Sequence, residues 1–218
     1  MDYDNNRILE LKNISLTLGK RRILKNIKLT LNKGTITIII GKSGSGKSTL
    51  LNVMNMLCVP DEGEYFMNGI KVDFYNEEMT ADLRSKIGFF HQELALLEGL
   101  SVCENMEIFS KVSQKQLNKM QLEKYLKLLE LEKVYASNVS VLSGGERQRA
   151  AFLKLLILPY DFIFIDEPTN NLDHENIEVI KRGINGLKEQ GKTVVVVSHH
   201  TPLREIADKT VELEEING

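Results

Sequence analysis

The sequence predicts an α/β protein that combines a mostly parallel sheet with an N-terminal antiparallel β-subdomain and a helical insert. Three runs of β-branched and aromatic residues have the nearly continuous apolar character of strands that are buried on both faces. These runs are residues 35–40, 162–165 and 193–197. Each run is followed by polar or glycine-rich residues that can begin a helix, and this order places a ligand at the carboxyl ends of the strands.

The antiparallel subdomain is predicted from residues 8–11 and 27–31, where apolar and polar residues alternate as in half-buried strands. Farther along, Asn68 and Gly69 separate two more strand-like segments. Both residues tolerate the positive φ angles that a two-residue hairpin turn requires. A hairpin at this position adds an antiparallel edge to the subdomain.

A helical insert is predicted over about residues 93–141, which carry no strong strand signal. Leucines recur there at helical spacing between charged residues, namely Leu122, Leu126 and Leu129. A chain of 218 residues suits one domain, because a single hydrophobic core keeps growing until roughly 250 residues. We therefore expect one domain over residues 1–218, with the insert inside its α/β core.

Composition and charge exclude several classes of function. The chain carries 28 Lys and Arg residues against 30 Asp and Glu residues, so it has no net positive field to hold nucleic acid. Cys58 and Cys103 form no CxxC pair, which favours reduced thiols and a cytoplasmic address. The N-terminus lacks the apolar core of a secretory signal. Residues 150–158, the most apolar stretch, fall short of the roughly 20 residues of a spanning helix, so we expect no direct membrane insertion.

A phosphate-binding loop is predicted from the pattern GxxxxGK(S/T), which begins at Gly41 between an expected strand and an expected helix. Its glycines let successive backbone N–H groups point at phosphate oxygens, and the helix N-terminus adds a partial positive charge. Lys47 is expected to bridge the β- and γ-phosphates of ATP, and the Ser48 hydroxyl to ligate Mg²⁺. A flexible Gly/Ser turn is the alternative, but the flanking strand and helix favour a P-loop NTPase core. The expected nucleotide-binding residues of the loop are Gly41, Ser43, Gly44, Ser45, Gly46, Lys47, Ser48 and Thr49.

Two adjacent carboxylates, Asp166 and Glu167, end one of the buried strands and precede Pro168. Neighbouring residues on a strand point to opposite sides. Asp166 is therefore expected beside Ser48 in the Mg²⁺ shell, whereas Glu167 faces the water that attacks the γ-phosphate and acts as its base. Alternatively, the three residues only form a turn that stops the strand. A nucleotide site nearby favours the first interpretation, because it needs a metal-binding carboxylate from a neighbouring strand.

Residues 142–149 read Leu-Ser-Gly-Gly-Glu-Arg-Gln-Arg, and with this signature sequence the chain resembles the ATP-binding cassette family. Ser143 with Glu146 also forms a capping box, so a helix that begins there offers unpaired N–H groups to an anion. A helix cap alone is the other interpretation. The resemblance implies that two cassettes pack head to tail. Ser143, Gly144 and Gly145 would then cap the γ-phosphate of a nucleotide held by the second copy.

Other motifs of the same family follow in order along the whole chain. Gln92 matches the glutamine that reaches Mg²⁺ or the attacking water, and His199 matches the histidine that contacts the γ-phosphate. Asp173 matches the nucleotide-site aspartate that crosses the dimer interface. The resemblance thus implies a catalytic set of Glu167, His199, Gln92 and Lys47, and a Mg²⁺-binding set of Ser48, Gln92 and Asp166.

The chain departs from the family pattern where most members carry an aromatic residue that stacks on adenine, because Leu18 stands there. Base recognition is then weaker or uses another aromatic residue, such as Tyr3. His200 replaces the aspartate that is usual after His199, and Val139 stands where many members have a proline. We expect catalysis to survive both of these changes.

Within the family, the short insert, residues 50–52 and the pair Glu104-Asn105 most resemble the macrolide-exporter and lipoprotein-release subfamily. The resemblance implies an ATPase subunit on the cytoplasmic, inner face of the cell membrane that powers a separate integral membrane permease. Its cargo would be a peptide, an antibiotic or a lipoprotein that is exported or extruded. The alternative is a cell-division cassette that signals through a similar membrane partner to a cell-wall hydrolase.

The leucines that follow Gln92, among them Leu96 and Leu97, admit two interpretations. They pack inside the helical insert, or some of them line a groove that receives a short cytoplasmic helix of the membrane partner. In the second case, closure around ATP moves the groove, because Gln92 ties its near edge to the nucleotide.

Overall fold

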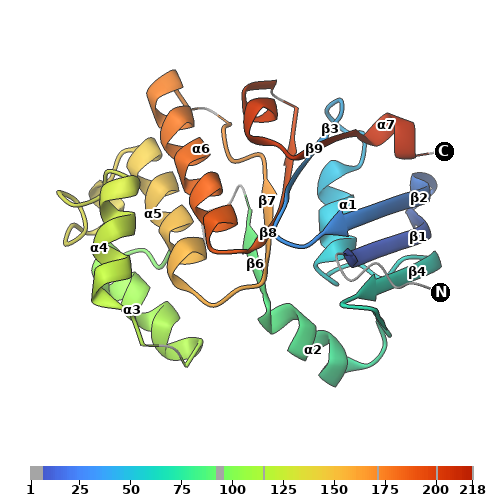
Figure 1. The fold of residues 1–218 in the computed structure, drawn as a ribbon, viewed down its shortest axis with the longest axis horizontal. Helices are drawn as coiled ribbons and strands as arrows, with labels where there is room; N and C mark the ends of the chain where they lie inside the picture. The colour runs from blue at the N-terminus through green and yellow to red at the C-terminus, as the bar shows by residue number, and fades with distance from the viewer. Residues whose placement is uncertain (1–6, 92–95, 115, 171, 200, 218) are drawn as a thin grey trace.

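A five-stranded parallel sheet in the order β6-β7-β8-β3-β9 stands beside a four-stranded antiparallel sheet in the order β2-β1-β4-β5 (Figure 1). The computed structural model describes residues 7–91, 96–114, 116–170, 172–199 and 201–217. The strands are β1 (Arg7–Leu18), β2 (Arg21–Asn32), β3 (Ile36–Ile40), β4 (Glu62–Met67), β5 (Ile70–Lys71), β6 (Ile87–Phe90), β7 (Phe162–Asp166), β8 (Thr193–Ser198) and β9 (Lys209–Glu212). The helices are α1 (Lys47–Met54), α2 (Glu77–Ser85), α3 (Val102–Val112), α4 (Lys119–Leu128), α5 (Gly144–Ile157), α6 (His174–Glu189) and α7 (Leu213–Ile216), with short 3-10 helices η1 (Val139–Val141) and η2 (Thr201–Ile206).

Both faces of the parallel sheet are covered. Helices α5 and α6 lie on one face, whereas α1 and the antiparallel sheet lie on the other (Figure 1). Side chains alternate along β3, so Ile38 packs into the core under α5 and α6, and Ile39 packs into the core under α1. Both residues are fully buried. The edge of the sheet at which β3 ends is therefore held in place from both sides.

The predicted α/β fold and its strands are confirmed. The three apolar runs form β3, β7 and β8, which are neighbours in the parallel sheet. The alternating segments lie in β1 and β2, and the hairpin turn has positive φ angles at Asn68 (52°) and Gly69 (75°). The sequence does not predict β6 and β9, which are the two outermost strands of the parallel sheet. Each is only four residues long, and β9 is mostly exposed, so neither shows the pattern of a long buried strand.

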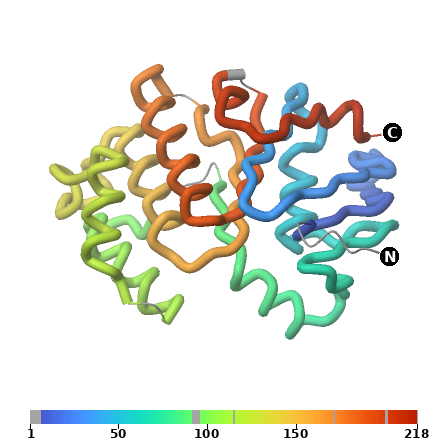
Figure 2. Tube along the Cα trace, in the orientation of Figure 1, coloured from blue at the N-terminus to red at the C-terminus, as the bar shows by residue number. Residues whose placement is uncertain are grey.

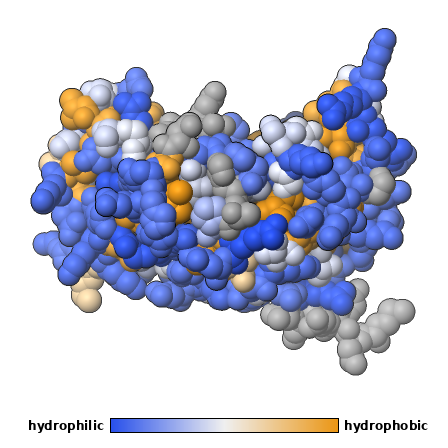
Figure 3. All heavy atoms as spheres, turned by 90° about the horizontal axis from the view of Figure 1, so that it is seen from above, coloured by the Kyte–Doolittle hydropathy of each residue, from blue (hydrophilic) through white to orange (hydrophobic). Residues whose placement is uncertain are grey.

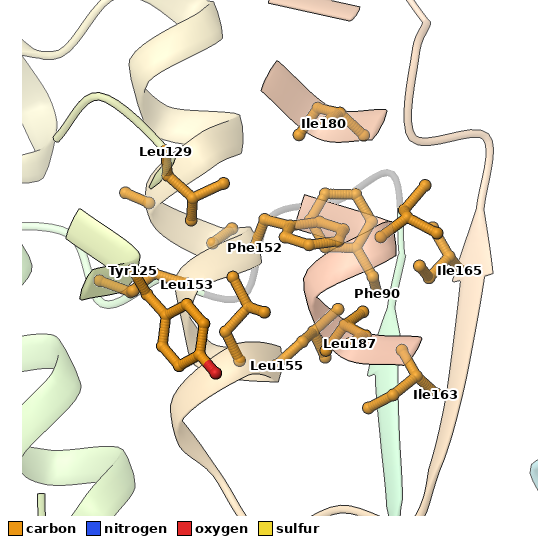
Figure 4. Packing of buried hydrophobic residues seen from close by; sticks show 14 of the residues in the cluster. Phe90, Tyr125, Leu129, Phe152, Leu153, Leu155, Ile163, Ile165, Ile180 and Leu187 are labelled. Carbon is orange, nitrogen blue, oxygen red and sulfur yellow. The ribbon is translucent and has the colours of Figure 1, made fainter. Parts of the chain in front are cut away.

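The stretch predicted as a helical insert contains α3 and α4, which lie on the outer side of α5 (Figure 1). Tyr125 and Leu129 from this layer share one buried cluster with Phe152 of α5 and Phe90 of β6 (Figure 4). The rings of Phe90 and Phe152 have their centroids 5.7 Å apart. A Cβ on Gly183 of α6 would lie 2.7 Å from the Phe152 ring, so any larger residue at this position would displace that ring. The cluster fixes α5 between the insert and the sheet.

The face shown in Figure 3 is mostly hydrophilic, and its hydrophobic side chains form small separate patches. Of the helices that the described residues form, none has the length and apolar character needed to span a bilayer. The last helix, α7, lies beside the antiparallel sheet (Figure 2). Just after it, the Asn217 side chain accepts a hydrogen bond from the backbone N–H of Lys25 at 2.7 Å. This contact holds the C-terminal segment against β2.

Candidate active site

The loop between β3 and α1 curls around the side chain of Lys47. Gly44 (φ 74°) and Gly46 (φ 105°) have positive φ angles, which other residues rarely adopt. Lys47 is the first residue of α1 and is only 6% exposed. Its Nζ donates hydrogen bonds to the carbonyl oxygens of Gly41 at 2.8 Å and Lys42 at 3.0 Å. The ammonium group is therefore held inside the loop, at the N-terminus of a helix.

Ser45 has a buried hydroxyl oxygen for which the described residues supply no hydrogen-bond partner. Gly41 leaves the space for it, because a Cβ on Gly41 would lie 2.8 Å from Ser45 Oγ. Buried polar groups in proteins are usually paired. An unpaired hydroxyl in a loop that also holds an ammonium group fits an anionic ligand such as phosphate. Of the other loop residues, Ser43 and Ser48 are exposed and Thr49 is half-buried.

Asp166 and Ser48 form a pair of oxygen groups next to the loop. Asp166 is the last residue of β7, is 4% exposed, and hydrogen-bonds with the Ser48 hydroxyl. Burial raises the pKa of Asp166, and the hydrogen bond from Ser48 and the nearby His91 oppose this effect. Its Oδ1 is buried and finds no hydrogen-bond partner within the described residues. Such hard oxygen groups suit Mg²⁺, which takes its remaining ligands from phosphate and water.

Glu167 faces a histidine and a lysine. Its backbone is left-handed (φ 47°), which is uncommon for a residue other than glycine and is often found at functional sites. Its Oε1 lies 2.8 Å from Nδ1 of His199 and 3.7 Å from Nζ of Lys47. Its Oε2 accepts a hydrogen bond from the backbone N–H of His199 at 3.2 Å. The carboxyl ends of β7 and β8, together with the start of α1 after β3, thus bring three of the expected catalytic residues together at one edge of the sheet.

A second cluster lies at the start of α5. The predicted capping box is confirmed: Ser143 Oγ accepts a hydrogen bond from the backbone of Glu146, whose side chain accepts one from Ser143 N at 2.8 Å. A Cβ on Gly144 would meet no atom within 4 Å. In the part of the chain that the structure describes, no hydrogen bond or ion pair joins residues 143–145 to the phosphate loop. The start of α5 is therefore open to another molecule.

Two contacts that the sequence did not predict tie α5 to the segment that leads from the carboxylates to α6. The side chain of Gln148 donates a hydrogen bond to the carbonyl oxygen of Pro168. The side chain of Arg149 donates one to Asn176, whose backbone N–H in turn donates to the Asp173 side chain at 2.8 Å, so that Asp173 caps the start of α6. An aspartate followed three residues later by a polar amide at a helix start was a signal for this arrangement.

Glu214 also belongs to the site and was not predicted. Its Oε1 accepts a hydrogen bond from the backbone N–H of Lys42 at 3.0 Å, and this contact lowers the pKa of Glu214. Glu214 reaches the loop because β9 runs parallel to β3, with Glu212 aligned to Ile40. A cavity of about 480 Å³ lies between Glu214, Lys42 and His199. Because the sequence of β9 has no clear strand pattern, Glu214 could not be predicted as a neighbour of the phosphate loop.

Three of the residues named from the sequence, Gln92, Tyr3 and His200, lie outside the described residues. Leu18 ends β1 and is 49% exposed. A second cavity of about 440 Å³ lies at the opposite edge of the sheet, where Lys192 lines it together with neighbouring residues. It contains none of the motif residues, so the carboxyl edge is the candidate site.

The sequence profile of the ABC transporter family matches residues 24–170 of this chain. The chain is 36% identical over 208 residues to the macrolide export ATP-binding/permease protein MacB of Campylobacter jejuni, which covers 94% of this chain and 32% of MacB. It is 36% identical over 211 residues to the lipoprotein-releasing system ATP-binding protein LolD of Aquifex aeolicus, which covers 95% of this chain and 94% of LolD. The chain thus spans about a third of the length of the MacB relatives and nearly all of LolD.

A third relative, MJ0796 of Methanocaldococcus jannaschii, is an uncharacterized ABC transporter ATP-binding protein that is 38% identical over 221 residues. These residues cover 95% of this chain and 94% of MJ0796. A dimeric structure of MJ0796 superimposes with a TM-score of 0.82 and 32% identity over 94% of each chain, and another MJ0796 dimer is a post-hydrolysis state bound to ADP and Pi. This chain therefore belongs to the ABC transporter family, and it is one of the ATP-binding and ATP-hydrolysing cassettes of that family.

Proposed function

We propose that the chain is the ATPase subunit of a transport machine and powers a separate integral membrane permease. It works as one domain over residues 1–218, with about residues 93–141 as a helical subdomain. The observation that carries this proposal is the geometry around Glu167, which lies 2.8 Å from His199 and 3.7 Å from Lys47. A nearly buried carboxylate between these groups suits the hydrolysis of a phosphoanhydride at the adjoining loop.

In this proposal the phosphate loop holds ATP through its backbone N–H groups and through Lys47. The Lys47 ammonium already lies inside the loop, 2.8 Å from the Gly41 carbonyl oxygen, and the buried Ser45 hydroxyl supplies a further polar group. The loop residues that contribute are Gly41, Ser43, Gly44, Ser45, Gly46, Lys47, Ser48 and Thr49.

Ser48 and Asp166 would hold Mg²⁺, and Gln92 would reach it from the segment after β6. The unpaired Oδ1 of Asp166 supports this assignment, because a buried carboxylate oxygen without a hydrogen-bond donor suits a cation. When bound, the ion would neutralise charge on the phosphates. The proposed Mg²⁺ site lies next to Glu167, because Asp166 and Glu167 are consecutive residues.

Glu167 would act as the general base that takes a proton from the attacking water. His199 holds both oxygens of this carboxylate, through its ring Nδ1 at 2.8 Å and its backbone N–H at 3.2 Å. The ring thereby fixes the direction of the base, and its other edge would contact the γ-phosphate. Lys47 Nζ lies 3.7 Å from Oε1, the same oxygen that the His199 ring contacts, and offsets its negative charge.

The complete site would be shared between two copies of the chain in a head-to-tail dimer. Ser143, Gly144 and Gly145 would contact the γ-phosphate held by the second copy, and Asp173 would cross the interface. The open start of α5 supports this arrangement, because a capped helix N-terminus with free space around Gly144 is suited to bind an anion. The dimeric structures of MJ0796 also support it.

The proposed location of the chain is the inner face of the cell membrane, where a permease would bind the helical subdomain. The cargo would be a peptide, an antibiotic or a lipoprotein, and the names of the MacB and LolD relatives support this class. Capture of the tagged chain from solubilised membranes tests the proposal. A permease partner with a large extracytoplasmic domain would support export, whereas a partner bound to cell-wall hydrolases would contradict it.

Leu96 and Leu97 offer a matched pair for the proposed permease contact. Leu96 is 9% exposed and packs in the core, whereas Leu97 is 44% exposed. The fully buried Asn105 fixes the backbone of Leu97, since it accepts a hydrogen bond from Leu97 N at 2.6 Å and donates one to Leu97 O at 3.1 Å. The two leucines that the sequence could not distinguish are thus one core residue and one surface residue.

We expect Leu97→Glu to abolish permease binding and permease-stimulated turnover while the basal ATPase rate and the melting temperature stay unchanged. Leu96→Glu should instead lower the melting temperature by at least about 5 °C, because it buries a charge in the core. Melting curves and co-purification with the permease measure both effects. If folded Leu97→Glu protein still captures the permease normally, Leu97 is not part of the permease contact.

A further inference from the structure

Asn176 joins the two helix starts that carry the proposed contacts to the second copy. It lies in the first turn of α6, and α6 begins beside the start of α5 at the same edge of the molecule (Figure 1). Its backbone N–H and its side-chain Nδ2 each donate a hydrogen bond to Oδ1 of Asp173, both at 2.8 Å. These hydrogen bonds lower the pKa of Asp173 and so favour its ionised form.

The other end of the same amide contacts α5. Asn176 Oδ1 accepts a hydrogen bond from Nη1 of Arg149. A Cβ added to Gly145 would lie 2.8 Å from the same oxygen, so Asn176 fits against α5 because residue 145 has no side chain. Gly145 and Arg149 are four residues apart and therefore lie on one face of the helix. One amide thus touches a glycine of the signature sequence and links an arginine of that sequence to Asp173.

The segment between Glu167 and α6 is tied to α5 at both of its ends. Gln148 binds the carbonyl oxygen of Pro168 at the beginning of the segment, and Arg149 binds Asn176 just beyond its end. The two donors are consecutive residues of α5. A shift of α5 would therefore be passed to the segment at both ends rather than at one.

We propose that Asn176 is a positioning residue that couples the start of α5 to Asp173, so that both approach the nucleotide of the second copy as one unit. The inference rests on the proposed shared site. A carboxamide suits this role because it donates to a carboxylate and accepts from a guanidinium group at the same time. An aspartate would keep the acceptor for Arg149 but would repel Asp173, and an alanine would remove both side-chain contacts and leave only the backbone hydrogen bond to Asp173.

The test compares Asn176→Asp and Asn176→Ala in the Glu167→Gln background, with MgATP present and sedimentation as the readout. We expect each substitution to raise the protein concentration at half-dimerisation about tenfold or more, as the loss of a hydrogen bond to a charged group typically does. The affinity of the monomer for MgADP should not change, and the melting temperature should fall by no more than about 4 °C, so that the monomer stays folded. Glu175→Gln, at the exposed neighbouring position, is the matched control and should behave like the parent protein.

A double-mutant cycle with Arg149→Lys separates positioning from a general loss of helix stability. If Asn176 acts through Arg149, the double variant should dimerise no worse than the weaker single variant. If the losses of dimer affinity from the two substitutions add, the coupling role of Asn176 is wrong. It is also wrong if the Asn176 variants dimerise as well as a Glu167→Gln parent that itself dimerises. Either result would leave the shared site intact. A parent that stays monomeric with saturating MgATP would overturn the shared site and this inference with it.

Discussion

Glu167→Gln should bind MgATP like the unmodified protein but hydrolyse it at least about a hundredfold more slowly, because removal of a general base typically costs 10² to 10⁴ in rate. Glutamine keeps the shape of glutamate and can still accept the hydrogen bond from the His199 backbone, which is 3.2 Å from Glu167 Oε2. It cannot take a proton from water. Binding and chemistry are therefore expected to separate in this variant.

Single-turnover hydrolysis and equilibrium nucleotide binding measure the two effects independently. Glu130→Gln serves as a control, because Glu130 is an exposed carboxylate that pairs only with Arg182 among the ion pairs of the described residues. Its turnover should match that of the unmodified protein. A turnover of Glu167→Gln within about threefold of normal would remove Glu167 from the role of base.

The same Glu167→Gln protein should dimerise when it holds MgATP and stay monomeric with MgADP. The start of α5 offers its N–H groups to an anion, and only ATP presents a γ-phosphate at the proposed interface. Because the variant hydrolyses ATP so slowly, the dimer should persist long enough for sedimentation analysis. A monomer at high protein concentration with saturating MgATP would show that the γ-phosphate does not join two copies.

Most of the fold could be predicted because the central strands carry their own signal. β3, β7 and β8 are buried on both faces, so their sequences are almost wholly apolar. The outermost strands β6 and β9 have only one strand neighbour each. β9 is also mostly exposed. The apolar sequence pattern that predicts a strand is therefore strong at the centre of the sheet and weak at its edges.

The candidate site likewise has parts that local sequence predicts and parts that only the tertiary fold brings together. Contiguous motifs identified the loop around Lys47 and the carboxylates at the end of β7, since strand ends of a parallel sheet meet at one edge. Glu214 and Asn176 were missed, because each acts on a residue that only the tertiary fold brings close. Leu96 and Leu97 show the same limit: Asn105 and the core decide which of them is exposed.

The most direct test of the shared site mixes two inactive variants before MgATP is added. Glu167→Gln lacks the base, and Gly144→Glu places a negative charge where the second copy's γ-phosphate is expected, in open space that tolerates a side chain. In a mixed dimer, one site combines the intact Glu167 of one copy with the intact signature sequence of the other. We expect the mixture to hydrolyse ATP several times faster than the average of its two components. A rate equal to that average would contradict a site built from two copies.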